Sequence, residues 1–389
     1  MLLLKNGLLN CMDRPAFVGD ILIENGKIVE VGERLKAIGA DVVDCDGLYI
    51  TPGFIDAHCH VGMWEDGMNE EGADGNECSD PITPQMRGLD GVNPFDRCFV
   101  EAYESGITTV LTGPGSANVI GGQFLAMKTA GRCLDDMLIK APAAMKAALG
   151  ENPKGVYSEQ KSSPYTRMAI ASLFRETMVE AQEYAHKIAL GSEDPEKQPD
   201  RDLSLEALLP VLSGTLPMKI HAHRADDILT AFRLADEFDI KISIEHCTEG
   251  HLIADVLREK LKNGHTGVVL GPIISERPKI EMRNLDLRAP KILYDAGINF
   301  ALMTDHPVIP IQYLPLCAAL CVREGLPEQS ALEAITINAA KITGLSKQIG
   351  SITPGKDADI AIFNGPALDV RSKNVCTIIN GRIAHNIMM

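Results

Sequence analysis

The sequence has few basic residues for its length. Its 389 residues include 37 Lys and Arg against 53 Asp and Glu, so the formal charge is −16. Binding to nucleic acid or to an anionic membrane surface needs basic patches, and this balance argues against both partners. The apolar stretches are shorter than the roughly 20 residues of a membrane span, and the start MLLLKNGLLN has no secretory cleavage pattern. The expected partner is a small-molecule substrate.

Paired cysteine motifs are also missing. The ten cysteines are scattered between Cys11 and Cys376, with no CxxC pair and no dense framework. In a chain of this length, that pattern is typical of reduced, mostly buried thiols in a cytoplasmic protein. With 45% hydrophobic and 23% charged residues, the composition is globular, which excludes a disordered or collagen-like chain.

Both chain ends have the pattern of short β-strands. Asn25-Gly26 separates two alternating apolar runs, which is a strong hairpin signal because both turn residues need positive φ. Asn6-Gly7 and Asn380-Gly381 carry the same signal. An isolated hairpin is only marginally stable in water. We therefore predict that residues 1–52 and 349–389 pair into one small β-sandwich domain beside a domain of residues 53–348.

The middle of the chain alternates short apolar runs with amphipathic segments. Strands are predicted at 106–113, 218–223, 240–247, 266–274 and 298–305, and helices at 225–238, 252–264 and 328–344. Repeated β-α units over this length favour an α/β fold with a (β/α)8 TIM-type barrel. A doubly wound open sheet is the alternative. It would need a Gly-rich phosphate turn after the first strand, where this sequence has histidines.

Histidines gather at the predicted strand ends. His58 and His60 are two residues apart on one strand, which places both imidazoles on the same side. Later strand ends carry further polar residues, namely His221, His223, His246, Asp305 and His306. Barrel chemistry takes place at the C-terminal rim, so we expect these side chains to converge there. Neutral imidazoles bind divalent transition metals, whereas protonated ones would repel each other. The pattern predicts a metal site.

The segments that carry these residues resemble the amidohydrolase superfamily. They are PGFIDAHCH (52–60), IHAH (220–223), IEH (244–246), TDHP (304–307) and GSITPGKDADI (350–360). The resemblance covers essentially the whole chain, including the split β-domain. It is nearer to the branch of imidazolonepropionase and the metal-dependent prolidase-like dipeptidases, because of HAH and the GGQ at 121–123. It implies a metal-dependent hydrolase of a carbon–nitrogen bond.

The resemblance also implies a role for each ligand. His58 and His60 would bind a first, more buried metal ion. Asp305 would bind the same ion and act as the general base. His221 and His246, at the ends of the fifth and sixth strands, would bind a second metal ion or, in mononuclear members, the single metal and the substrate.

A carboxylated lysine or a glutamate at the end of the fourth strand bridges the metals in many members. That position falls on Lys146, with Lys154 and Glu151 as substitutes. One or two divalent ions are expected. Zinc is the default by ligand type, and manganese or iron suits His and Asp ligands nearly as well.

Other residues near the strand ends are expected to contact substrate. They are His223, Arg224, Gly121, Gly122, Gln123 and His306. His223 either points away from His221 or lies just past the strand end, where the chain can turn. There it would bind substrate or orient His221. With Asp305 and His246, it is one of the three residues assigned to catalysis.

Two charged features bear on the substrate. An acidic insertion over 61–97 carries Trp64, Glu65, Glu77 and Asp80, which are expected to overhang the metal and favour a cationic group. Arg224 and Arg277 follow strand ends and would clamp a carboxylate in a bidentate manner. A substrate with both charges would be an amino acid derivative or a dipeptide.

The predicted mechanism is attack of a metal-activated water. A metal lowers the pKa of bound water toward about 7, and Asp305 would pass its proton to the leaving nitrogen. A heterocycle deaminase is an alternative, disfavoured because Asp226 and Asp227, and no glutamate, follow the fifth-strand histidine. A non-catalytic scaffold is a further alternative. It should have lost metal ligands, whereas this chain keeps His58, His60, His221, His246 and Asp305. A homo-oligomer is left open, since barrels with exposed apolar helices often pair.

Overall fold

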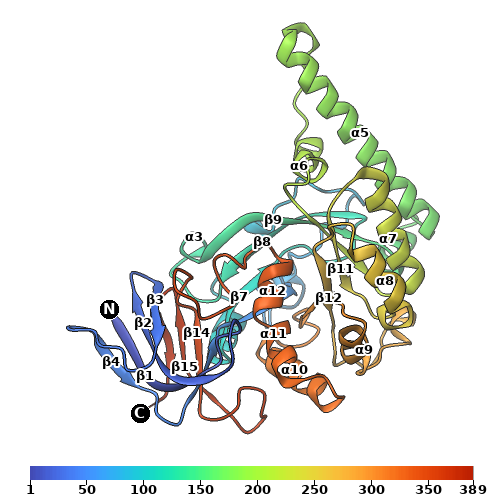
Figure 1. Ribbon diagram of the computed structural model, residues 1–389. Helices are drawn as coiled ribbons and strands as arrows, with labels where there is room; N and C mark the ends of the chain where they lie inside the picture. The colour runs from blue at the N-terminus through green and yellow to red at the C-terminus, as the bar shows by residue number, and fades with distance from the viewer. Residues whose placement is uncertain (389) are drawn as a thin grey trace.

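Both ends of the chain contribute to one sheet in a computed structural model that describes residues 1–388 (Figure 1). Over these residues, the sheet has eight strands in the order β16-β15-β14-β5-β1-β2-β3, with β4 beside β1. The strands are β1 (Leu2–Leu9), β2 (Phe17–Glu24), β3 (Lys27–Gly32), β4 (Asp41–Asp44), β5 (Tyr49–Pro52), β14 (Ile360–Phe363), β15 (Asn374–Ile379) and β16 (Arg382–Asn386). Antiparallel pairing of β5 with β14 joins the two ends, which confirms the predicted separate sheet.

The three Asn-Gly pairs have different outcomes. Asn25-Gly26 joins β2 to β3 and Asn380-Gly381 joins β15 to β16, as hairpin turns. The prediction is wrong for Asn6-Gly7, because β1 continues through both residues. The β1–β2 register shifts between Leu4 and Gly7, and Asn6 has a φ of 62°. Some β-bulges place a residue at positive φ, as a hairpin turn of this type also does, so the dipeptide alone cannot distinguish them.

The second sheet is the predicted barrel, with one departure. In the described part of the chain it is a nearly closed set of eight strands, β6 to β13 in sequence order. They are β6 (Phe54–Cys59), β7 (Ile107–Thr112), β8 (Ile120–Lys128), β9 (Leu138–Ala148), β10 (Met218–Ala222), β11 (Ile242–His246), β12 (Gly267–Leu270) and β13 (Phe300–Leu302). The departure is β8, which runs antiparallel to β7 and β9. Antiparallel neighbours need no crossover helix, so the regular β-α alternation is interrupted there.

Side-chain and backbone hydrogen bonds help to close the barrel between β6 and β13. The Asp56 carboxylate accepts from the Thr304 amide at 3.0 Å and from the Thr304 hydroxyl at 2.5 Å. The His60 amide donates to the His306 carbonyl at 2.9 Å. Asp56 is fully buried, and burial raises its pKa to about 7. These bonds hold the C-terminal ends of β6 and β13 side by side.

The helices lie in the connections between the barrel strands and after the last of these strands. They are α1 (Gly88–Gly91), α2 (Arg97–Glu104), α3 (Leu134–Met137), α4 (Glu151–Glu159), α5 (Arg167–Glu193), α6 (Leu203–Leu212), α7 (Ala225–Phe238), α8 (Ala254–Leu261), α9 (Ala289–Asp295), α10 (Leu314–Arg323), α11 (Glu328–Ala334) and α12 (Ile337–Ile342). The predicted helix at 225–238 is α7, whereas the one at 328–344 breaks into α11 and α12. Figure 1 shows α5 projecting beyond the barrel. Over residues 1–388, no helix is long and apolar enough to cross a membrane.

One end of the barrel is packed with apolar residues. Ala339 and Ala340 of α12 belong to the same buried cluster as Ile55 of β6 and Val269 of β12. The Ile55 amide also donates to the Ile335 carbonyl. This packing occupies the end where β6 begins, so polar side chains are gathered at the opposite, C-terminal rim.

Candidate metal centre

Two groups of ligand side chains lie at the C-terminal rim, among residues 1–388. The first consists of His58, His60 and Asp305, whose ligand atoms lie within 4.8 Å of one another. The Asp305 Oδ1 atom is 3.3 Å from His60 Nε2 and 3.7 Å from His58 Nε2. Asp305 has a φ of 55°, so the chain turns sharply after β13. The structure therefore brings together two histidines and an aspartate that are about 245 positions apart in sequence.

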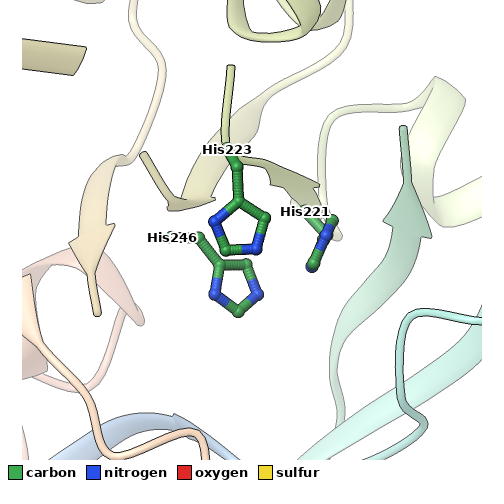
Figure 2. A group of neighbouring side chains, drawn as sticks. All are labelled: His221, His223 and His246. Carbon is green, nitrogen blue, oxygen red and sulfur yellow. The ribbon is translucent and has the colours of Figure 1, made fainter. Parts of the chain in front are cut away.

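The second group consists of His221, His223 and His246 (Figure 2). Since β10 ends at Ala222, His223 lies just past the strand end, and its ring joins the group instead of pointing away from His221. Ring centroids are 4.2 Å apart for His221 and His246, and 4.5 Å for His223 and His246. The rings of His58 and His246 are 5.6 Å apart, so the two groups are neighbours.

Lys146 lies beside the first group. It comes from β9 near the strand end, and its Nζ atom is 3.2 Å from His58 Nε2. The side chain is fully buried, and burial lowers its pKa to about 7 against the opposing effect of Asp305. Much of Lys146 is therefore a neutral amine near neutral pH. The substitutes Lys154 and Glu151 lie on α4 instead, where they line a pocket next to the second group.

The protonation states suit a metal. Burial lowers the pKa of His58, His221 and His246 well below the ordinary value, and that of His223 to about 3. In the part of the chain that the structure describes, buried ring nitrogens of the second group have no hydrogen-bond partner, including Nε2 of all three histidines. A buried polar atom without a partner is costly, and a metal ion would satisfy these nitrogens. The residues therefore fit a divalent metal ion.

Three of the imidazoles that face the rim are oriented through their other nitrogen. His60 Nδ1 is 2.8 Å from the Gly113 carbonyl, and His246 Nδ1 is 3.0 Å from the Gly271 carbonyl. His223 Nδ1 is 2.7 Å from the Thr248 hydroxyl. Such contacts select the tautomer and leave Nε2 free to face a metal.

Two buried charged residues behind His58 were not predicted from the sequence. Glu245 of β11 lies 2.8 Å from His58 Nδ1, and Lys219 of β10 lies 2.8 Å from Glu245. All three side chains are buried. The spacing of Lys219, two residues before His221 on the same strand, was a signal that it shares a side of β10 with that ligand. Glu245 has no comparable signal, because its partner comes from a distant strand.

Glycines predicted to form the pocket wall lie on β8. A Cβ on Gly121 would meet Lys146 Cγ at 3.7 Å, so Gly121 lies beside that lysine. Gly122 has a φ of 121°, and a Cβ there would meet the Met86 carbonyl oxygen at 2.5 Å. Gly122 thus allows close contact between β8 and the 61–97 insertion.

Two other predicted substrate residues face elsewhere. The Gln123 side chain donates to the Pro84 carbonyl at 3.3 Å and lines a separate pocket. The His306 ring is buried, and its Nδ1 accepts the Ile311 amide proton at 3.1 Å. Burial lowers the His306 pKa to about 4. The structure places neither residue in the two ligand groups.

The acidic insertion contributes an aromatic side chain to the site. The Trp64 ring lies 5.1 Å from the His60 ring, edge to face. Glu77 and Asp80 instead accept hydrogen bonds within their own turns, from the amides of Ser79 and Ile82. Trp64 therefore covers the first group, while these two carboxylates are engaged away from it.

A pocket of about 380 Å³ adjoins the second group. Its lining includes Arg224, Lys154 and the buried carboxylate of Glu281. The Arg224 guanidinium donates a hydrogen bond to the Asp226 carboxylate at 2.8 Å. Arg277 does not line this pocket and donates to the Leu285 carbonyl at 2.8 Å. The structure does not bring the two arginines together as the predicted clamp.

Known proteins match most or all of this chain. The amidohydrolase family model matches residues 212–384. The crystal structure of an amidohydrolase from Thermotoga maritima is 40% identical and superposes with a TM-score of 0.96 over 100% of both chains. The amidohydrolase tasK of Hapsidospora irregularis is 31% identical over 94% of this chain, which spans only 40% of that relative. An imidazolonepropionase of Geobacillus kaustophilus is 29% identical over 90% of this chain and 84% of its own length.

The fold and site thus define an enzyme that acts on carbon–nitrogen bonds. The chain belongs to the amidohydrolase family.

Proposed function

We propose that this protein hydrolyses an amide or cyclic amide bond of a small molecule. The observation that carries the proposal is the meeting of two ligand groups at one rim, with Asp305 in the first group and the neutral rings of His221, His223 and His246 in the second. A polar cluster of this composition has no structural need at the rim of a barrel whose other end is packed with apolar residues. Its donors suit metal-assisted hydrolysis.

The first group, with Lys146, would hold one divalent ion, and the second group would hold another. A bound divalent metal supplies a nucleophilic water at neutral pH and polarises the scissile carbonyl. Zinc is the proposed metal, because nitrogen and carboxylate donors in a buried site suit it. Lys146 as a neutral amine is in the form that carbon dioxide can carboxylate, which would give it a negative charge beside His58.

Asp305 is the proposed general base. Its side chain is 13% exposed, whereas that of His58 is 0% exposed, so the carboxylate is the more accessible of the two. It would take the proton from the attacking water and deliver it to the leaving nitrogen, which must be protonated to depart. Trp64 limits access of bulk water to the same side.

The test is a hydrolysis screen of metal-loaded protein with N-acyl amino acids, dipeptides and cyclic amides. For any substrate found, Asp305→Asn is expected to lower kcat by about 10²- to 10⁴-fold, the usual contribution of a positioned base. Metal content is measured in parallel because Asp305 is also a ligand. Asp295→Asn, an exposed aspartate on α9, is the matched control. Full activity of the Asp305 variant would contradict the assignment.

Deamination of a heterocycle is the second candidate. No glutamate follows the fifth-strand histidine in sequence, but Glu281 supplies a buried carboxylate from another segment, 3.5 Å from His221 Nε2. The screen therefore includes aminated heterocycles, with ammonia release as the readout.

The proposal also covers partners and location. The net charge of −16 supports a small molecule over nucleic acid or a membrane surface as the partner. The scattered cysteines support a cytoplasmic location.

A further inference from the structure

Glu281 is a buried carboxylate held at the second ligand group by a distant helix. It lies on a short 3₁₀ helix (Ile280–Met282) in the connection between β12 and α9, and its side chain is 1% exposed. Its Oε2 atom accepts the Glu151 amide at 2.9 Å, and the Glu151 carboxylate accepts the Glu281 amide at 3.1 Å. This reciprocal pair anchors Glu281 to the start of α4.

The absence of a side chain at Gly150 leaves room for this carboxylate. Gly150 precedes α4 with a φ of 84°, and a Cβ there would lie 2.7 Å from Glu281 Oε2. A side chain at position 150 would therefore displace the carboxylate as well as strain the backbone. The position of Glu281 is thus determined from two sides.

The second carboxylate oxygen faces the histidines. Glu281 Oε1 lies 3.5 Å from His221 Nε2 and 3.7 Å from His223 Nε2, and it has no hydrogen-bond partner within residues 1–388. Donors bound to one tetrahedral ion at bond lengths near 2.0–2.1 Å lie roughly 3.3–3.4 Å apart. The observed separations are within a few tenths of an ångström of that value.

We propose that Glu281 is a ligand of the second metal ion, together with His221, His223 and His246. The inference rests on the metal site of the proposed function and adds a ligand to it. Three neutral imidazoles leave the charge of a divalent ion uncompensated in a buried site, and Glu281 supplies an anionic donor there. Glu281 would bring the number of protein donors to the second ion to four.

The test compares metal binding by Glu281→Gln and the parent protein. Full-length protein is stripped with a chelator and titrated with Zn²⁺, and bound equivalents are measured by elemental analysis after gel filtration. The parent is expected to hold two equivalents. The variant is expected to hold one tightly and the second at least about 100-fold more weakly, since loss of a group that merely supports a ligand already costs 10- to 100-fold. Titration with Co²⁺ reports the same loss in the visible spectrum.

Controls separate a lost ligand from a damaged fold. Glu276→Gln, an exposed residue in the same connection, is expected to keep both equivalents. Circular dichroism checks the fold of Glu281→Gln. If that variant is unfolded, Glu281→Asp replaces it, because the shortened carboxylate should weaken the second site alone.

Each remaining outcome overturns a different claim. Two equivalents with unchanged affinities in Glu281→Gln would overturn the ligand assignment and leave the hydrolase proposal standing. If such a variant also lost activity, Glu281 would act on substrate, as the deaminase candidate requires. A parent protein that binds no metal would overturn both proposals.

Discussion

Lys128 offers a test of how the two sheets are held together. It comes from β8 of the barrel, is 2% exposed, and forms ion pairs with Asp357 and Asp359 just before β14. The Lys128–Asp357 distance is 2.9 Å. The Asp359 carboxylate also accepts the Asn380 amide at 2.9 Å. We predict that Lys128→Met, which retains the apolar stem and removes the charge, destabilises the fold.

The size of the effect follows from burial. Both carboxylates are about 5% exposed. The variant leaves Asp359 without a cationic partner, whereas Asp357 keeps Lys27 at 2.6 Å. Breaking a buried ion pair by removing one partner costs about 3–5 kcal/mol. At about 2.1 cal/mol/K per residue, 389 residues have an unfolding entropy of about 0.8 kcal/mol/K. The expected decrease in Tm is therefore about 4–6 °C.

The loss of stability in Lys128→Met should depend on pH in one direction. Burial pushes the pKa of Asp357 upward, but Lys128 and Lys27 outweigh it and hold the pKa below its ordinary value. Burial raises the pKa of Asp359 even with Lys128 present. Without Lys128, the pKa values of both carboxylates rise in the folded state, and the pKa of Asp359 moves further above the unfolded value near 3.9. The folded variant then binds more protons than the unfolded chain, so its stability increases as pH falls. The Tm deficit should be smaller at pH 5 than at pH 8.

The assay is thermal unfolding of parent and variant at both pH values. Arg132→Met removes an exposed ion pair near the end of the same strand and should leave Tm unchanged. The triple variant that also carries Asp357→Asn and Asp359→Asn should recover most of the loss, because no buried charge is left unpaired. A Tm deficit that grows toward acidic pH, or an unchanged Tm for Lys128→Met, would refute the reasoning.

Three further predictions concern the site. Glu245→Gln removes the negative charge 2.8 Å from His58 Nδ1. The affinity of the tighter zinc site should then fall by about 10- to 100-fold. An unchanged zinc titration would mean that this contact does not orient His58. Gly122→Ala forces a Cβ against the Met86 carbonyl at a residue with positive φ. We expect the free energy of unfolding to fall by about 2 kcal/mol and proteolysis within 61–97 to become faster. Unfolding and digestion equal to those of the parent would contradict this prediction. Chelation of bound metal should lower Tm by about 5 °C if the free metal exceeds Kd 1,000-fold; coincident melting curves would argue that metal does not stabilise the fold.

The sequence by itself determined which elements form and where the ligands are expected. The alternation of apolar runs predicted β10 to β13 and α7, and the Asn-Gly pairs predicted the hairpins at 25–26 and 380–381. These signals are local, since they depend on periodicity and on the φ that a residue tolerates. The spacing that predicts His58 and His60 on one side of a strand is a local signal as well.

Only the tertiary structure decided which groups meet. Asn6-Gly7 is a bulge because β1 has a partner on each side, and β8 is antiparallel because of its pairing with β7 and β9. Glu281 lies in a connection without periodicity, and it reaches His221 only because Glu151 holds it there. Pairing and burial between distant segments depend on the whole chain, so no window of sequence contains them.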